Sequence, residues 1–303
     1  MASVSRSIAK AAKRACIIEV TSHPKPGNVS IFSSHRDLRY EHFVSAARAI
    51  EEPIKKLIER TLKAKKSRKP EKIGLGRAIY ECAEASFAAC GNRNVNSGII
   101  LLLVPLAAGF ALNQRDPQAG AVRAVNSTTP EDSVNFYKAM RLLKPRLETR
   151  ENEKYDIYDE KSDGKLLRYG VNFPKLFRLT DDLIGSEVAG GFERTYEAAE
   201  YLGGVFEKME KLNPSVCQTY LYSLSKHRDT HAARQAGEEK AERIMKRAQR
   251  ILKKGGVLER EGLMETAKFD RELKAQGVNP GASADLVCGA IFLCLLRDEL
   301  GKE

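Results

Sequence analysis

The chain has 303 residues, of which 42% are hydrophobic and 30% are charged. This composition is that of an ordinary globular protein, and it excludes a collagen-like or an intrinsically disordered chain. The net charge of +11 is compatible with a polyanionic ligand such as a nucleotide triphosphate, with nucleic acid, or with a solvated basic surface that binds nothing specific.

Apolar runs and cysteines bear on location. Residues 1–13 mix serine, alanine and basic residues without an apolar core, so they do not resemble a secretion signal. The longest apolar run, Gly98 to Leu112, contains Pro105 and is shorter than the roughly 20 residues that span a bilayer. It predicts a central buried helix. The six cysteines form no C-x-x-C pair and predict buried free thiols, so we expect a cytoplasmic protein with no membrane contact.

Apolar residues recur at steps of three and four along the regular parts of the chain, beginning with Ile8, Ala11, Ala15 and Ile18. This spacing is typical of amphipathic helices, and strand-like alternation is hard to find. The sequence therefore predicts an all-α fold. The polar stretch 146–172 lacks a helical face and contains Ser162-Asp163-Gly164, so it predicts an irregular loop.

Capping residues and prolines mark several helix starts. Thr129-Pro130 predicts an N-cap followed by a proline in the first turn. Thr180-Asp181-Asp182 predicts a helix that runs toward Leu202, with bends at the paired glycines 190–191 and 203–204. Asn213-Pro214 opens a helix that ends near His227. Asp229 begins a long helix that continues toward Arg250.

Four short polar segments that contain glycine or a histidine each adjoin an apolar helical run, and they predict one site assembled from distant parts of the chain. They are residues 23–28, 92–98, 229–231 and 279–285. Each combines residues that helix interiors avoid with a charge or hydroxyl that suits a phosphate, a metal or a sugar.

The first segment presents Lys25 from a turn that Pro24 and Pro26 stiffen, beside Gly27, which permits a positive φ. This arrangement suits a phosphate, and the alternative is a loop whose prolines only end the preceding helix. His35, Arg36 and Asp37 follow closely. Arg36 suits a bidentate phosphate contact, and Asp37 suits a metal or the orientation of Arg36.

The second segment crowds asparagines before the apolar run, where one N-cap would be enough. Asn94 and Asn96 suit recognition of a sugar or a phosphate, and internal Asx turns are the alternative. Glu84, on the helix that this loop terminates, is a candidate for the same pocket. Glu81 lies one turn earlier on that face and competes with it.

In the last two segments, polar residues lie at helix starts. Asp229 before Thr230 reads either as a helix cap or as a functional carboxylate. Gly281 to Asp285 leads a proline–glycine turn into an apolar helix, whose free N–H groups suit an anion. The alternative is that Ser283 and Asp285 only cap their own helix. No H-E-x-x-H text accompanies the nearby histidines, so zinc is not expected.

These segments resemble, in family order, motifs of the triphosphoribosyl-dephospho-coenzyme A synthase family. The resemblance runs from about Ala11 to Leu296. The matching texts are Glu19 to Asn28 for E-V-x-x-x-P-K-P-G, Ser34 to Asp37 for G-x-H-(K/R)-D, Glu84, Asn94 to Gly98 for N-T-H-K-G or the archaeal-type N-T-N-x-G, Asp229-Thr230 for D-T, and Pro280 to Leu286 for P-G-(G/T)-(S/T)-A-D-L. The central stretch, including Tyr155-Asp156 and 181–192, resembles the archaeal-type branch. Because the resemblance spans the loop at 146–172, we expect one multi-helix domain over residues 1–303.

The resemblance implies an enzyme that transfers the 5-triphosphoribosyl group of ATP to the 2′-hydroxyl of dephospho-CoA and releases adenine. It places a catalytic role on Asp229 and Glu84 and implies Mg²⁺ with the triphosphate. Asp37, Asp229 and Asp285 are the candidate Mg²⁺ ligands. The expected substrate contacts come from residues of all four segments and from the nearby 34–37 text: Lys25, Gly27, His35, Arg36, Asn94, Asn96, Thr230, Gly281 and Ser283.

Two departures from the family texts keep alternatives open. Asn96-Ser97 stands where bacterial members carry His-Lys, and Ala232, Ala233, Gln235 and Ala236 replace most of the basic residues after the D-T pair. These changes are consistent with phosphoribosyl transfer to another acceptor, for example in methanopterin-type cofactor synthesis. The basic charge alone would also fit a non-catalytic nucleotide- or RNA-binding protein. The basic runs lack interleaved aromatic residues, so nucleic acid is not the expected partner.

Overall fold

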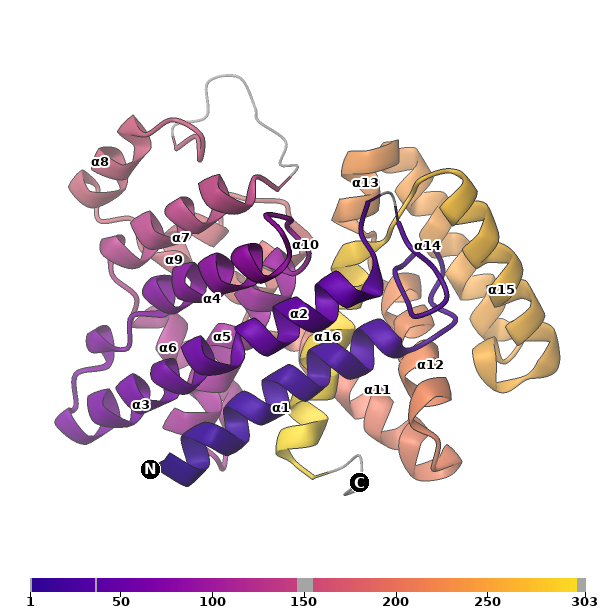
Figure 1. The fold of residues 1–303 in the computed structure, drawn as a ribbon, viewed down its shortest axis with the longest axis horizontal. Helices are drawn as coiled ribbons and strands as arrows, with labels where there is room; N and C mark the ends of the chain where they lie inside the picture. The colour runs from indigo at the N-terminus through magenta and orange to yellow at the C-terminus, as the bar shows by residue number, and fades with distance from the viewer. Residues whose placement is uncertain (1, 36, 146–154, 299–303) are drawn as a thin grey trace. The chain divides into compact units, whose positions relative to one another are not determined.

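The structure, a computed structural model, describes residues 2–35, 37–145 and 155–298 (Figure 1). In these ranges the regular elements are α-helices and two 3₁₀ turns, and the only β-type pairings are isolated bridges at Ser30–Ser33 and His35–Leu38. The predicted all-α class is therefore confirmed. The chain divides into two compact units: residues 1–13 with 45–192, and residues 14–44 with 193–303. Helices α1 (Ala2–Thr21) and α2 (Tyr40–Ala49) each contribute to both units. The single domain expected over 1–303 stays a prediction.

The first unit is built around α5 (Ser97–Leu112), almost all of whose side chains are buried. This confirms the central buried helix predicted from the apolar run. Its other helices are α3 (Glu51–Ser67), α4 (Leu75–Ala89), α6 (Pro117–Asn126), α7 (Pro130–Leu143), α8 (Lys161–Arg168), α9 (Phe173–Phe177) and α10 (Leu183–Gly190), with the 3₁₀ turn Pro70–Lys72. Helix α5 packs on α6 and α3, and α4 packs on α7.

Helix α7 starts where the sequence predicts, because Thr129 and Asp132 form a reciprocal capping box with Pro130 in the first turn. The N–H of Thr129 donates to Oδ2 of Asp132 at 2.9 Å, and Oδ1 accepts from the N–H of Gly76 at 2.8 Å. Burial raises the pKa of Asp132, although these hydrogen bonds oppose the rise. One buried carboxylate thus joins the starts of α4 and α7.

The close approach of α5 and α6 depends on glycine. A Cβ at Gly120 would lie 2.2 Å from the carbonyl oxygen of Gly109. No helix in the described ranges is alone long and apolar enough to cross a membrane, and α5 and α6 pass that test only as a pair bent by 113°.

We expect Gly120→Ala to lower the free energy of unfolding by at least about 2 kcal/mol, because the clash is with rigid backbone. The matched control is Gly204→Ala in α11 (Glu193–Met209), where a Cβ meets nothing within 4 Å. There alanine should stabilise the protein by about 0.5–1 kcal/mol through helix propensity. Denaturant unfolding of both variants tests this, and equal effects would contradict the packing argument.

The irregular loop predicted over 146–172 is wrong in part, because α8 (Lys161–Arg168) runs through Ser162-Asp163-Gly164. Ser162 and Leu166, four residues apart, are buried on one face of this helix. Its Asp163 accepts two hydrogen bonds from the guanidinium of Arg141, at 2.7 and 3.0 Å. Tertiary packing therefore outweighs the local turn signal. Residues 146–154 of this range lie outside the described residues.

The second unit contains α16 (Gly281–Leu296), which is buried along most of its length and packs on α11 (Glu193–Met209) and α12 (Leu212–Lys226). Its remaining elements are α13 (Thr230–Ala236), α14 (Glu238–Lys253), the 3₁₀ turn Gly256–Leu258 and α15 (Arg260–Ala275). All six cysteines are buried thiols outside any disulfide, as predicted, and Sγ of Cys16 lies 3.8 Å from Sγ of Cys288.

Three other predicted boundaries can be compared with the helices. Helix α12 ends at Lys226 with His227 as its C-cap, close to the predicted end. The helix expected from 180–182 toward Leu202 is wrong, because Gly191, with φ 83°, ends α10 and separates it from α11. The bend predicted at 203–204 is also wrong, because α11 continues through these residues without a break. The long helix expected from Asp229 toward Arg250 is wrong. Gly237, with φ 87°, ends α13 and separates it from α14.

Candidate functional site

Asp229 joins the starts of two helices in the second unit. Its Oδ1 accepts from the N–H of Ala232 at 2.8 Å and so caps α13. Its Oδ2 accepts from both the N–H and the Oγ of Ser283, at 2.7 and 2.8 Å, in the first turn of α16. The carboxylate is fully buried. It therefore fixes the start of α16 as well as capping its own helix, which the sequence did not reveal.

Lys25 is buried against Glu19, near the end of α1. Its ammonium donates to the Glu19 carboxylate and, at 2.5 Å, to the main-chain oxygen of the same residue. Neither side chain is appreciably exposed. Burial raises the pKa of Glu19, whereas the charge and hydrogen bond of Lys25 oppose the rise. The phosphate role of Lys25 stays a prediction, and in this structure its ammonium is engaged by Glu19.

The turns at 24–28 and 278–281 are tied to each other. The Tyr220 hydroxyl on α12 lies 2.9 Å from the carbonyl oxygen of Pro26 and 3.3 Å from that of Pro280, and one hydroxyl hydrogen donates between them. The N–H of Gly27 donates to Oδ1 of Asp270 on α15 at 2.9 Å. Gly27 has φ +77°, and a Cβ there would lie 2.5 Å from the Val278 oxygen. The structure thus brings together Gly27, Asp229, Gly281 and Ser283 within one unit.

The start of α16 is also bordered by polar side chains of α13. The His231 ring packs so closely on Gly281 that a Cβ there would lie 2.2 Å from Nδ1. Gln235 lies 3.1 Å from His231 and accepts from the N–H of Asn279 at 2.8 Å. The side-chain oxygen Oδ1 of Asn279 is buried and has no hydrogen-bond partner among the described residues. An unsatisfied buried acceptor calls for an explanation, and a ligand donor supplies one.

The remaining candidates of this unit are placed as follows. Thr230 follows the Asp229 cap and is buried, and Asp285 is half-buried one turn into α16. His35 is buried and pairs through its backbone with Leu38. Asp37 is exposed. Arg36 lies outside the described residues, so its predicted phosphate contact has no structural account.

Glu84, Asn94 and Asn96 belong to the first unit. Asn96 is buried before α5, where its Oδ1 accepts from Oγ of Ser86 at 2.7 Å. Its Nδ2 is also buried and has no hydrogen-bond partner among the described residues. Asn94 is half-buried. Each unit is described by itself, so the convergence of all four segments on one site stays a prediction.

The two carboxylates predicted to compete on α4 differ in their partners. Glu84 is exposed and accepts from the Tyr80 hydroxyl at 3.1 Å. Glu81 pairs with Arg77 at 2.8 Å and Arg60 at 3.2 Å. Partial burial opposes ionisation of Glu81, but the two arginines outweigh it and lower its pKa. Glu81 is therefore an ion-paired structural residue, and Glu84 is the more available carboxylate.

The predicted Mg²⁺ ligands do not fit a resident metal site. Across the described ranges, no group of three or more histidine, cysteine, aspartate or glutamate side chains could hold a metal ion. Both oxygens of Asp229 are already occupied by three donors. The described residues therefore offer no cage for a resident Mg²⁺ ion.

Sequence reasoning missed Asp270, and it gave no individual role to Glu19 or Asn279, although both lie in segments that it singled out. The E-V-x-x-x-P-K-P-G motif contains a usable signal for Glu19, because an acidic residue near the end of a helix precedes a lysine in the following turn. Asp270 lies next to the buried Phe269 on α15. Nothing in the sequence around it indicates that its carboxylate accepts a hydrogen bond from the N–H of the distant Gly27. Asn279 reads as ordinary turn text.

The comparisons with known proteins point to one family. The family model for ATP:dephospho-CoA triphosphoribosyl transferase matches residues 5–303. Two similar relatives are called 2-(5''-triphosphoribosyl)-3'-dephosphocoenzyme-A synthase. The Escherichia fergusonii protein is 24% identical over 295 residues, covering 95% of this chain and 90% of its own. The Klebsiella pneumoniae protein is 24% identical over 291 residues, covering 94% and 89%.

A solved structure has the same fold. It comes from Archaeoglobus fulgidus and is described as a triphosphoribosyl-dephospho-CoA synthase. It superposes with a TM-score of 0.63 at 23% identity, and the match covers 84% of this chain and 98% of that one.

Proposed function

Because the chain belongs to the ATP:dephospho-CoA triphosphoribosyl transferase family, we propose that it moves the 5-triphosphoribosyl group of ATP to the 2′-hydroxyl of 3′-dephospho-CoA and releases adenine. The family match over residues 5–303 carries this proposal. The geometry supports it, since the texts at 24–28, 229–230 and 280–285 are cross-linked by buried hydrogen bonds in one unit.

In the proposed reaction, the acceptor oxygen attacks the anomeric carbon of the ribose as the bond to adenine breaks. The transition state resembles an oxocarbenium ion, as in glycoside hydrolysis, so a carboxylate is needed to take the proton of the attacking hydroxyl. We assign this role to Glu84, which is exposed and accepts a single hydrogen bond among the described residues. Asp229 is assigned a positioning role, because its oxygens hold Ala232 and Ser283.

The substrate contacts are assigned from position and hydrogen-bonding capacity. Asp229 occupies the N–H of Ser283, and the carbonyl oxygen of Asn279 accepts from the N–H of Gly281, so a phosphate at the first turn of α16 would bond to the N–H of Ala282 near the positive end of the helix dipole. The Nδ2 of Asn96 would donate to a sugar or phosphate oxygen, and the Oδ1 of Asn279 would accept from a sugar hydroxyl. We propose that Mg²⁺ arrives with the ATP triphosphate rather than in a protein cage, as Mg²⁺ bound chiefly through substrate phosphates does.

The proposal predicts that purified protein releases adenine from ATP only when dephospho-CoA is present. Chromatography would measure free adenine, and mass spectrometry would show an acceptor adduct that keeps all three phosphates. Coenzyme A, which carries an additional phosphate on the ribose next to the attacking hydroxyl, is the control acceptor and should react poorly. Adenine release that does not depend on the acceptor would indicate hydrolysis, and no release with any acceptor would overturn the proposed activity.

A further inference from the structure

Phe32 is the most exposed large apolar side chain in the described ranges, with 73% of its surface open to solvent. Its neighbour Ile31 is also exposed. Isolated exposed apolar residues are common on protein surfaces and alone imply no function. The setting of Phe32 is different, because hydrogen bonds hold its ring in a defined turn between two segments of the candidate site.

The turn that carries Phe32 is closed by a reciprocal pair of main-chain hydrogen bonds. The N–H of Ser30 donates to the main-chain oxygen of Ser33 at 3.0 Å, and the N–H of Ser33 donates to that of Ser30 at 3.1 Å. The N–H of Phe32 also lies 3.3 Å from the Ser30 hydroxyl, to which it donates. Ile31 and Phe32 occupy the two central positions, where glycine, asparagine, aspartate and proline are usual. Formation of the turn therefore does not explain an aromatic residue there.

His23 supports the Phe32 ring on one side. The two ring centres are 5.1 Å apart with an interplanar angle of 67°, which is an edge-to-face contact. The Ser30 hydroxyl lies 3.2 Å from Nδ1 of His23, and the Asn213 side chain on α12 bonds the main-chain N–H and oxygen of His23, at 2.9 and 2.8 Å. Burial lowers the pKa of His23, so near neutral pH its ring packs as an uncharged aromatic group. The Phe32 ring is therefore preorganised while most of its surface stays open.

The turn lies beside the segments that form the candidate site of the second unit. His23 directly precedes the turn that contains Gly27, where a Cβ would lie 2.5 Å from the main-chain oxygen of Val278. Val278 leads within three residues to Gly281 at the start of α16. On its other side, the Phe32 turn ends two residues before the buried His35. An open aromatic ring is thus presented next to the segments that are proposed to bind phosphate and sugar.

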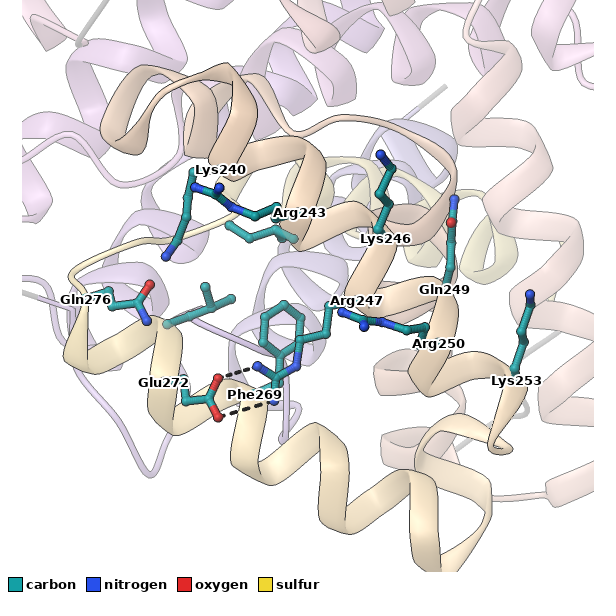
Figure 2. A pocket seen from close by; sticks show the side chains of 12 residues that line it. Lys240, Arg243, Lys246, Arg247, Gln249, Arg250, Lys253, Phe269, Glu272 and Gln276 are labelled. Carbon is teal, nitrogen blue, oxygen red and sulfur yellow. Dashed lines mark hydrogen bonds and ion pairs between the residues drawn. The ribbon is translucent and has the colours of Figure 1, made fainter.

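The groove between α14 and α15 offers no comparable surface (Figure 2). This groove of about 670 Å³ is lined mainly by basic side chains, and the only aromatic ring in its lining is Phe269. Phe269 is buried, and the Arg247 guanidinium lies 4.7 Å from its ring centre and is held there by Glu272. The face of that ring is therefore not available to a base.

A protein partner explains the Phe32 turn less well than a flat ring does. A specific protein interface usually buries about 800 Å² on each side, which is far more than two adjacent side chains provide. A fixed aromatic ring with an open face suits a base, because every base offers a flat π-face for stacking.

We propose that the Phe32 ring stacks on the adenine ring of a nucleotide substrate and so positions that substrate beside the start of α16. The identification of adenine rests on the proposed function, in which both ATP and dephospho-CoA carry this base. Removal of an aromatic stacking partner typically weakens binding by about 5- to 150-fold per base. Phe32 thus contributes affinity for the base, and the segments around it contribute affinity for the phosphates and the sugar.

A fluorescence experiment tests the stacking directly, because the chain contains no tryptophan. Phe32→Trp introduces a single indole at the proposed position, and adenine that stacks on it should quench its emission. We expect ATP or dephospho-CoA to do so, whereas inorganic tripolyphosphate and 4′-phosphopantetheine, which carry no base, should not. Met264→Trp is the matched control, since Met264 is 65% exposed on α15 in the same unit. The nucleotide that quenches only Phe32→Trp identifies which adenine is bound.

Calorimetric titration then separates the aromatic ring from apolar bulk. Phe32→Ala and Phe32→Leu should each bind that nucleotide about tenfold more weakly, whereas Phe32→Tyr and Met264→Ala should stay within about twofold of the original protein. Unchanged affinity of Phe32→Ala for both nucleotides would overturn the inference. So would quenching of Phe32→Trp no stronger than that of Met264→Trp, or a dimer that Phe32→Ala dissociates while both affinities stay the same.

The outcomes also separate this inference from the proposed function. Binding of ATP that depends on Phe32, without adenine release under any condition, refutes the transfer activity alone. Normal adenine release with nucleotide binding that does not depend on Phe32 refutes the stacking role alone.

Discussion

Asp229→Ala should lower the free energy of unfolding by about 3–5 kcal/mol. The substitution leaves the N–H groups of Ala232 and Ser283 and the Ser283 hydroxyl without their buried acceptor. A helix cap alone would contribute only about 0.5–2 kcal/mol. Asp116→Ala is the matched control, because Asp116 caps α6 through one bond to Ala119 and is exposed. Denaturant unfolding of the two variants measures the difference, and equal losses would reduce Asp229 to a cap.

Asp229→Asn distinguishes positioning from proton transfer. Asparagine keeps one acceptor for the cap, but its amide cannot accept all three bonds, so we expect a loss of about 1–3 kcal/mol. If Asp229 positions the start of α16, the folded variant should show a raised KM for ATP and a smaller change in kcat. A large fall in kcat at unchanged KM would instead return Asp229 to the role of proton acceptor.

Lys25→Met should also destabilise the protein by about 3–5 kcal/mol, because it leaves the Glu19 carboxylate buried without its cation. Lys13→Met is the control, since Lys13 pairs with Glu51 at 2.6 Å while both side chains stay partly exposed. That pair should contribute no more than about 1 kcal/mol. The double variant Lys25→Met/Glu19→Leu should recover most of the loss, because an apolar pair replaces the buried charges.

The Lys25→Met loss should depend on pH. Burial raises the pKa of Glu19 above its ordinary 4.5, and removal of Lys25 takes away the charge that opposes this rise. A carboxyl whose pKa is raised on folding contributes stability below its ordinary pKa and loses it as the pH rises toward the folded value. The deficit should therefore be small near pH 4 and grow toward pH 7. A deficit that is equal at both values would contradict the buried-pair account.

The sequence predicted the helices well where local signals and packing agree. The apolar run at Gly98 to Leu112 and the capping text at Thr129-Pro130 both mark the observed elements. The prediction failed at α8, where burial of Ser162 and Leu166 and the ion pair of Arg141 with Asp163 outweigh a glycine. It failed again after Asp229, because Gly237 ends α13 although the helical periodicity of the sequence predicts one continuous helix there.

The site was less predictable than the fold. Motif texts placed Gly27, Asp229 and Ser283 among the candidates, and the structure links their segments through hydrogen bonds. Which atom bonds to which depends on partners far away in sequence, such as Asp270 for Gly27 and Tyr220 for Pro26. No local pattern encodes these pairings. For the same reason the sequence did not reveal that Lys25 pairs with Glu19. The charge of Lys25 and the prolines on either side of it are also consistent with an open phosphate-binding loop.

The division of the chain into two units has a consequence for the order in which they form during synthesis. Residues 45–192 meet most of their partners within one continuous stretch, so this unit can begin to pack as soon as that stretch leaves the ribosome. Residues 14–44 instead belong with 193–303, and the partner of Gly27, Asp270, is made near the end of the chain. Completion of that unit therefore includes the entropic cost of closing a very long loop. The segment that carries Lys25 and Gly27 therefore waits through most of synthesis before its native environment exists.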